Sequence, residues 1–254
     1  ARRDAGMLRD LLILGKTPSP LIERPMPRPG EVVSLPRKSP DMSRTVAVVK
    51  VVRETQDAVS IELAERDGTP LKFKPGQFLS VDVTIDGERF RRAYSLSNAC
   101  LEGTPTQITV KRIPDGLVSN YLNDTIAAGQ ELSVLGPSGS FTIEPSAIKR
   151  RHLVMIAGGS GITPIMSILE TALRVEPGTR VTLIYGNRGW DDVIFRERLA
   201  RLSEEFGERL TVDHVLERPP QGWTGDRGLL VNDVIESRMR ALKLEDDGMQ
   251  RYFI

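Results

Sequence analysis

Hydrophobic and polar residues alternate from Thr45 to about residue 148, in short runs separated by Gly, Pro and Asp. This alternation is typical of strands with one buried face, and its spacing is that of an antiparallel barrel. The runs with this pattern are residues 45–52, 58–63, 76–83, 107–113 and 131–135. We therefore predict one small β-barrel over residues 45–148.

The pattern changes after Arg150. Residues 152–157 are almost continuously apolar, as in a strand buried on both faces of a parallel sheet. A glycine cluster follows, and then apolar residues recur at helical spacing from Ile165 to Leu173, with Thr163 placed to cap this helix and Pro164 in its first turn. Further strands at 181–185, 210–216 and 252–254 alternate with helices at 192–205 and 229–242. We predict a doubly wound parallel-sheet α/β domain over residues 149–254.

Residues 1–44 form a third segment, which holds seven of the seventeen prolines and a net charge of +4. Only the part before Lys16 has the spacing of a helix. Two interpretations remain open, namely an arm that docks on a partner or on the rest of the chain, and an extension that packs irregularly.

Composition excludes several classes of function. The formal charge of +1 is too mild for a nucleic-acid protein, and no apolar run approaches the roughly 20 residues of a membrane helix. Without a secretory signal, a cytoplasmic location is expected. Cys100 is the only cysteine, so neither an internal disulfide nor a four-cysteine metal site can form from this chain alone. His152 and His214 are too few for a metal cluster, and we expect no metal.

The run Arg92-Ala93-Tyr94-Ser95 combines a cation, an aromatic ring and a hydroxyl on an expected strand. Side chains alternate along a strand, so Arg92 and Tyr94 should lie on one face. A guanidinium can hold a pyrophosphate, a phenol ring can pack on a cofactor, and a hydroxyl can reach a ring nitrogen. The run fits a flavin site, and it fits an ordinary strand equally well.

Two glycine-containing turns are candidate phosphate sites. Gly159, Ser160 and Gly161 lie between a buried strand and a helix, where backbone amides and the helix N-terminus attract an anion. Gly116 to Ser119 precede a short helix at 120–123, with Ser119 as its cap; the alternative for this turn is an ordinary loop.

Gly186-Asn187-Arg188 follows the second expected strand of the α/β domain, where the common dinucleotide fold has an acid that binds a ribose hydroxyl. Arg188 could accept a 2′-phosphate, which slightly favours NADPH over NADH. The alternative is a solvated arginine neutralised by Asp191 or Asp192.

Six motifs together resemble the ferredoxin–NADP reductase superfamily, and most closely the reductase components of multicomponent oxygenases. They are Pro75–Phe78, Arg92–Ser95, Val110–Arg112 with Gly116–Ser119, Gly136–Pro137, Gly158–Pro164 and Tyr185–Arg188. The resemblance implies an FAD barrel followed by an NAD(P) domain, with hydride passing from nicotinamide to the flavin. FMN is an alternative flavin.

The resemblance also assigns roles to residues. It implies that Arg92 holds the FAD pyrophosphate, that Tyr94 packs on the flavin and that Ser95 bonds near its N5, the last two forming the catalytic pair. Val110 and Lys111 would flank the cofactor, and its phosphates would meet Gly116, Val118 and Ser119. The NAD(P)H pyrophosphate would meet Gly159, Ser160 and Gly161, with Thr163 near the stacked rings.

The end of the chain departs from this pattern. Relatives continue after a strand like 252–254 with Cys-Gly-Pro, another helix and often a ferredoxin-like domain, so we expect a fragment of a longer protein. A [2Fe–2S] centre is expected only if the protein continues past Ile254. The predicted function is an NAD(P)H-dependent FAD reductase that delivers single electrons to a ferredoxin, an oxygenase, a P450 system or its own ferredoxin domain. The alternatives are a flavin-bearing protein that does not oxidise NAD(P)H and a colourless binding module.

Overall fold

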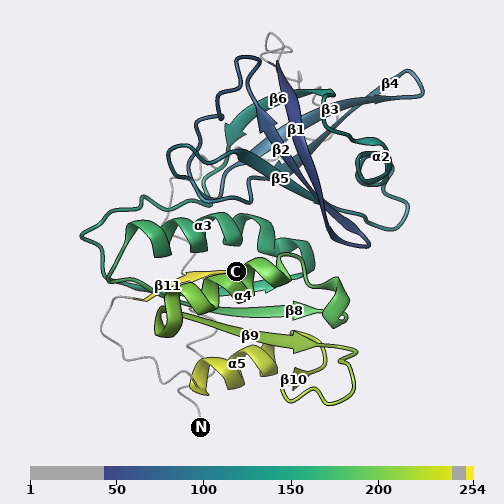
Figure 1. The fold of residues 1–254 in the computed structure, drawn as a ribbon. Helices are drawn as coiled ribbons and strands as arrows, with labels where there is room; N and C mark the ends of the chain where they lie inside the picture. The colour runs from purple at the N-terminus through teal and green to yellow at the C-terminus, as the bar shows by residue number, and fades with distance from the viewer. Residues whose placement is uncertain (1–42, 242–249) are drawn as a thin grey trace, which may run out of the picture. The chain divides into compact units, whose positions relative to one another are not determined.

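The structure is a computed structural model that describes residues 43–241 and 250–254. The helix predicted before Lys16, and nearly all of the Pro-rich segment, lie outside the described residues. Two sheets make up the described part, one antiparallel and one parallel (Figure 1).

The antiparallel sheet contains six strands in the order β4-β3-β6-β1-β2-β5. An isolated bridge between Leu96 and Ile108 joins the chain after β4 to β5, so the two outer strands meet and the sheet closes. Its inward side chains form a core of Val, Ile and Leu, and the predicted barrel is confirmed. The bounds are β1 Arg44–Thr55, β2 Ala58–Ala64, β3 Phe78–Ile85, β4 Glu88–Ser95, β5 Thr106–Lys111, β6 Glu131–Ser138 and, between β5 and β6, helix α2 Leu117–Thr125.

The parallel sheet contains five strands in the order β10-β9-β8-β7-β11. Its strand β7 is buried on both faces, as the apolar run predicts. The bounds are β7 His152–Gly158, α3 Ile162–Val175, β8 Arg180–Asn187, α4 Arg196–Phe206, β9 Leu210–Leu216, β10 Asp226–Arg227, α5 Asn232–Ala241 and β11 Gln250–Phe253.

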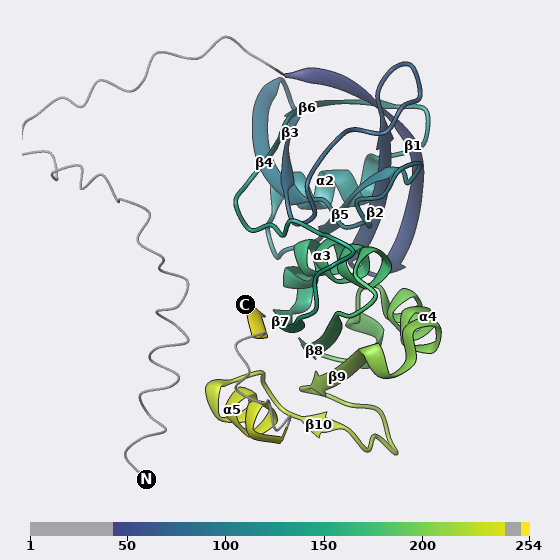
Figure 2. The same ribbon diagram turned by 90° about the vertical axis from the view of Figure 1, so that its left-hand side faces the viewer.

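Helices cover both faces of this sheet. One core joins α3 and α4 to residues such as Leu153, Met155 and Leu183. A smaller core joins Val234 and Ile235 of α5 to residues that point the other way, among them Ile156 and Ile184. Figure 2 shows α5 and α4 on opposite sides of the strands. The doubly wound architecture is therefore confirmed, whereas the exact domain boundary at 148/149 stays a prediction.

Both predicted side-chain caps are wrong. Helix α3 begins after Gly161 and helix α2 after Gly116, and neither has a side-chain cap bond. The Thr163 hydroxyl donates instead to the Ser160 carbonyl oxygen (3.0 Å), and the Ser119 hydroxyl donates to the Gly116 carbonyl oxygen (3.1 Å). Both hydroxyls thus brace their turns from inside the helix and do not accept from a first-turn N–H group.

Two helices begin later than predicted. Helix α4 starts at Arg196 because Phe195 adopts φ +63°, a left-handed conformation that interrupts any helix from residue 192. Helix α5 starts at Asn232, and residues 229–231 form a loop in which Leu230 packs on the sheet. Among the described helices, none combines the length and apolarity required to cross a membrane.

Candidate functional site

The glycine turn between β7 and α3 is open to the outside of the fold. Gly158 and Gly161 have no heavy atom within 4 Å of where a Cβ would stand, and Gly159 has only the Lys111 ammonium there, at 3.3 Å. Gly159 also adopts φ +49°, which favours glycine. No side chain caps the start of α3, and its first N–H, that of Ile162, bonds the carbonyl oxygens of Gly159 and Ser160 within the turn. This arrangement suits a phosphate group.

The turn is held from behind by the neighbouring strand. Tyr185, fully buried on β8, donates its hydroxyl to the Gly159 carbonyl oxygen at 2.9 Å. Burial raises the pKa of this phenol, so it remains a neutral donor. The tyrosine of the 185–188 motif therefore fixes the glycine turn and does not face a ligand.

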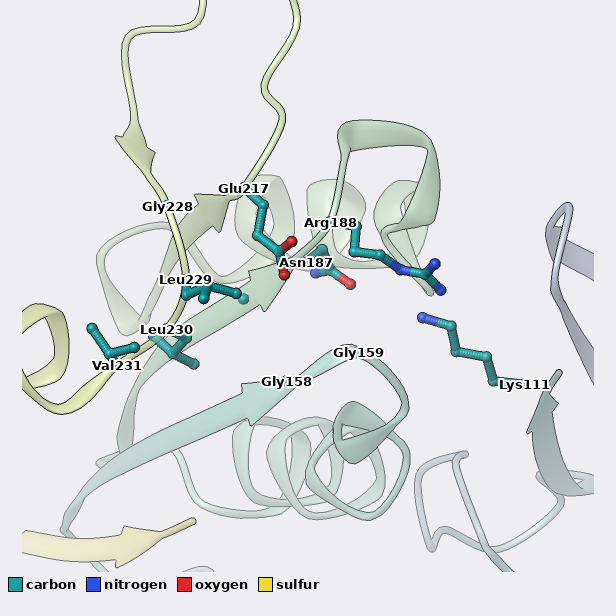
Figure 3. Close-up of a pocket in the computed structure, with 11 residues that line it drawn as sticks. Lys111, Gly158, Gly159, Asn187, Arg188, Glu217, Gly228, Leu229, Leu230 and Val231 are labelled. Atoms are coloured by element: carbon teal, nitrogen blue, oxygen red, sulfur yellow. The ribbon is translucent and has the colours of Figure 1, made fainter. Parts of the chain in front are cut away.

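A cavity of about 390 Å³ lies at the carboxyl ends of β7, β8 and β9 (Figure 3). This is the edge where open parallel sheets bind ligands. Its lining brings the predicted residues Gly159, Asn187 and Arg188 together with Lys111 of the barrel, which was expected to flank the flavin. The remaining lining residues are Gly158, Gly186, Glu217, Gly228, Leu229, Leu230 and Val231.

Two cations face this cavity. The Lys111 and Arg188 side chains point toward one another in Figure 3, and neither has an ion-pair partner among the residues that the structure describes. Burial, and then the charge of Arg188, lower the pKa of Lys111, and the charges of Asp192 and Asp57 partly oppose this shift. Asp191 pairs with Arg196 instead (3.1 Å), and Asp192, the other aspartate of the predicted alternative, makes no ion pair with Arg188 among the described residues. Two adjacent unpaired cations favour an anionic ligand.

The amide of Asn187 is the polar group best placed to bind a ligand. Asn187 is 7 % exposed, and neither polar atom of its buried amide makes a hydrogen bond of good geometry within the described residues, although the amide lies close enough to the Tyr185 hydroxyl to oppose the rise in the pKa of that phenol. Leaving such a group unpaired is costly, whereas a polar ligand in the cavity would satisfy it. Asn187 can both donate and accept, as a nucleotide would require.

A second set of residues lies in the barrel at the start of α2. An added Cβ at Gly116 would lie 2.5 Å from the Ser119 hydroxyl, so only glycine fits this close turn. Val118 and Ser119 are buried, and the Asn123 amide donates to the Val110 carbonyl oxygen (3.1 Å), which docks α2 on β5. The open N–H groups of the first turn again offer an anion site.

On β4 the predicted alternation of faces is observed. Arg89 and Arg91 both bond the buried carboxylate of Asp82 and hold its pKa below the ordinary range. Arg92 therefore lies on the opposite face with an exposed side chain, and its charge acts on Tyr94. Burial raises the pKa of Tyr94 to about 12. Arg92, Tyr94 and Ser95 thus present a cation, a neutral phenol and a hydroxyl along one strand.

The site contains residues that the sequence interpretation missed. Glu217 follows β9 at the same edge as Arg188, a position that the strand-end rule could have identified. Residues 229–231 were assigned to a helix, but they form one wall of the cavity. Leu230 lies so close to Gly186 that an added Cβ there would approach the Leu230 Cβ to 2.8 Å.

Neither histidine belongs to a cluster of metal-ligating side chains among the described residues. The His152 ring bonds the Thr182 hydroxyl (2.8 Å), and His214 packs against Trp190. Burial lowers the pKa of His214 to about 4. Within the described ranges, no group of three metal-ligating side chains occurs.

Comparison with known proteins finds two domain families in the chain. Residues 45–143 match the oxidoreductase FAD-binding domain, and residues 155–253 match the oxidoreductase NAD-binding domain. The two matched regions coincide with the barrel and with the parallel sheet.

Curated relatives include components of oxygenation enzymes. The chain is 40 % identical over 208 residues to one component of the 1,2-phenylacetyl-CoA epoxidase of Escherichia coli K12, covering 80 % of this chain and 55 % of that protein. It is 43 % identical over 188 residues to the ferredoxin reductase component of the 3-ketosteroid-9-alpha-monooxygenase of Rhodococcus rhodochrous, covering 73 % and 52 %. The chain thus spans about half the length of the curated relatives it matches.

A solved structure shows the same fold. The ferredoxin NADP+ reductase of Neisseria gonorrhoeae, with bound FAD and NADP, has a TM-score of 0.67 at 23 % identity, covering 84 % of this chain and 85 % of that one.

Proposed function

Because this chain belongs to the ferredoxin–NADP reductase superfamily, we propose that it is an NAD(P)H-dependent FAD reductase that serves a redox protein. FAD, when bound, accepts two electrons as hydride from a pyridine nucleotide and releases them singly. The observation that supports this function best is the cavity at the strand ends, where an open glycine turn meets two unpaired cations and an unpaired buried amide. This cavity also argues against the alternative, a flavin-bearing protein that does not itself oxidise NAD(P)H.

The barrel residues fit the adenine dinucleotide of FAD. We assign the flavin pyrophosphate to the start of α2, at Gly116, Val118 and Ser119, with Arg92 as the neutralising cation. The Gly116 N–H donates to the Ile113 carbonyl oxygen (3.0 Å), so the amides offered to the phosphates are those of Val118 and Ser119 in the first turn. Tyr94, which stays a neutral phenol, supplies an aromatic surface, and the Ser95 hydroxyl supplies a hydrogen bond. Val110 completes the apolar floor beneath the flavin.

The parallel-sheet residues fit NAD(P)H. Gly159, Ser160 and Gly161 offer backbone amides to its pyrophosphate, and Thr163 braces this turn. The cavity changes one expected role: Lys111 faces the glycine turn, so we propose that it neutralises the nucleotide pyrophosphate. Arg188 would add a second cation, and Asn187 would bond the ribose or its phosphate.

Glu217 shifts the choice of nucleotide toward NADH. Its carboxylate lines the same cavity as Arg188 and would repel a 2′-phosphate, while it could accept a hydrogen bond from a ribose hydroxyl. Arg188 points toward Lys111 and away from Glu217 (Figure 3), so it is better placed for the pyrophosphate. We therefore propose NADH as the preferred donor, in place of the slight preference for NADPH that Arg188 suggested.

The acceptor is a redox protein. The candidate acceptors are those expected from the sequence: a ferredoxin, an oxygenase, a P450 system, or a ferredoxin domain with a [2Fe–2S] centre in the same protein. The curated relatives support this, since their names pair them with oxygenation systems. We propose a cytoplasmic location, a compartment in which reduced pyridine nucleotide is available.

Anaerobic titration of the purified protein tests the proposal. We expect flavin absorbance in the protein as isolated, and bleaching of this absorbance by stoichiometric NADH. Flavin that neither NADH nor NADPH bleaches would indicate the flavin-bearing protein without nucleotide oxidation, and a protein that binds no flavin would indicate the binding module.

A further inference from the structure

The segment that follows the flavin motif is tied to both helices on one face of the parallel sheet. This segment, residues 97–100, begins two residues after Ser95. Arg198 of α4 donates its Nη1 hydrogen to the Ser97 carbonyl oxygen (3.3 Å). The backbone N–H of Cys100 donates to the Thr171 hydroxyl of α3 (2.8 Å). The barrel and the nucleotide domain are therefore joined by two directional bonds beside the proposed flavin site.

Segment 97–100 is rigid within the barrel. Ser97 is fully buried; its N–H donates to the Gln107 carbonyl oxygen (2.8 Å), and its hydroxyl bonds the Thr109 hydroxyl (2.7 Å). The Asn98 side chain accepts from the Gln107 N–H (2.8 Å) and donates to the Pro105 carbonyl oxygen. A displacement of this segment would therefore move the end of β4 with it.

The groups on the other side are equally fixed. Arg198 also donates to the carboxylate of Glu170, whose side chain is only 9 % exposed, and Arg174 donates to the second oxygen of the same carboxylate (2.9 Å). Thr171 is fully buried and donates its own hydroxyl hydrogen to the Ser167 carbonyl oxygen (2.6 Å), so its lone pairs face Cys100. Glu170 and Thr171 both belong to α3, the helix that starts at the glycine turn.

We propose that Arg198 and Thr171 are positioning residues, which set the place of the Ser95 end of β4 relative to the glycine turn. The inference rests on the proposed function, since it concerns how two bound rings meet. Reaction between two stacked rings depends steeply on their separation, and a misplacement of about 1 Å can cost roughly 100-fold in rate. Arg198 and Thr171 touch neither proposed phosphate site, so their removal should slow reduction of the flavin without weakening either cofactor.

An apolar contact should keep the two domains together when these bonds are removed. An added Cβ at Gly76 would lie 2.9 Å from the Ile168 Cδ1 atom, so the turn before β3 packs closely on α3. Ala58 and Ile143 also belong to the core of the parallel-sheet domain. Variants that remove these two hydrogen bonds should therefore still fold with the two domains in contact, but the two cofactor sites should be less precisely aligned.

The test is stopped-flow reduction of the bound flavin by NADH, without oxygen, in the full chain. For Arg198→Gln we expect the limiting rate constant to fall about tenfold or more, with the apparent Kd for NADH and the FAD content changed less than about twofold. Arg174→Gln is the matched control, because it removes the other arginine from Glu170 and also the Glu205 ion pair (2.7 Å), but does not touch segment 97–100. Equal rates in Arg198→Gln and wild type, or equal losses in both variants, would overturn the inference.

A second pair of variants gives a readout besides activity. Thr171→Val removes the acceptor of the Cys100 N–H at nearly constant volume, and Thr171→Ser restores it. In Thr171→Val we expect faster hydrogen exchange at the Cys100 amide. We also expect a weaker long-wavelength charge-transfer absorbance between the stacked nicotinamide and flavin. Both should be recovered in Thr171→Ser. Unchanged exchange in Thr171→Val would show that the segment is not anchored. Wild-type flavin that NADH and NADPH leave oxidised would refute the proposed function itself, whereas a fully active Arg198→Gln refutes only the positioning role.

Discussion

The Tyr185 hydroxyl donates a 2.9 Å hydrogen bond to the carbonyl oxygen of Gly159, the first residue of the glycine turn. Strand β8 thereby holds the turn that follows the neighbouring strand β7. Such a bond contributes about 1 kcal/mol. Tyr185→Phe should therefore raise the Kd for NADH about threefold to tenfold, because the turn is less well held.

Equilibrium titration of the nucleotide checks this expectation. Tyr121→Phe is a suitable control, since Tyr121 is 37 % exposed on α2 and its loss should leave the Kd for NADH unchanged. A Tyr185→Phe protein with wild-type affinity would contradict the role of the bond.

Arg92 and Arg91 occupy opposite faces of β4, which makes them a matched pair. We expect Arg92→Ala to weaken FAD binding at least about tenfold, because it removes the proposed pyrophosphate cation. Arg91→Ala should retain FAD but unfold more easily, because the buried Asp82 carboxylate loses one of its two arginines. FAD content after gel filtration and urea unfolding distinguish the two, and equal FAD loss in both would contradict the assignment.

Glu217 should decide between the two nucleotides. Glu217→Gln removes the negative charge at nearly constant volume, so we expect kcat/KM for NADPH to rise about tenfold while that for NADH changes little. Steady-state kinetics with both donors provides the measurement. If the wild-type protein already prefers NADPH, or if the variant leaves the ratio unchanged, the carboxylate does not select the nucleotide.

His214 should make stability depend on pH. Burial lowers its pKa from 6.5 to about 4, so the folded protein binds this proton less readily than the unfolded chain. The free energy of unfolding should therefore be constant with respect to this group above pH 6.5 and fall as the pH drops from 6.5 toward 4. The full loss is roughly 3 kcal/mol at most.

Urea unfolding at several pH values tests this dependence. His214→Phe keeps an aromatic ring beside Trp190, with which His214 makes an edge contact at 5.1 Å, but it cannot titrate. We expect a flatter profile in this variant between pH 6.5 and 4. An identical slope in both proteins would assign the acid sensitivity to other groups.

Local patterns were sufficient to predict the main elements. The apolar run at 152–157 identifies β7, and the helical spacing from Ile165 identifies α3, because a buried strand and an amphipathic helix each impose a period on the chain. The two glycine turns were also predictable, because each is formed by a few consecutive residues next to a helix start. The caps predicted at Ser119 and Thr163 were wrong, because each hydroxyl donates to a carbonyl oxygen one turn back and does not accept from a first-turn N–H group.

What the sequence could not indicate are the contacts between distant residues. Ser97 and Arg198 are 101 residues apart, and nothing in either neighbourhood predicts their bond. Glu217 and Lys111 likewise come to one cavity from different domains, so their opposite charges could be weighed only once the fold was known.

Helix α3 begins at the glycine turn and, through Ile168 and Thr171, also contacts the barrel. The rim of the cavity, by contrast, takes Arg188 and Glu217 from the ends of strands β8 and β9. Engineering of chimeric reductases should respect this division. On the proposed function, we expect that donor preference can be exchanged by grafting a few rim side chains, whereas α3 has to be transplanted as one module with segment 97–100 and Arg198.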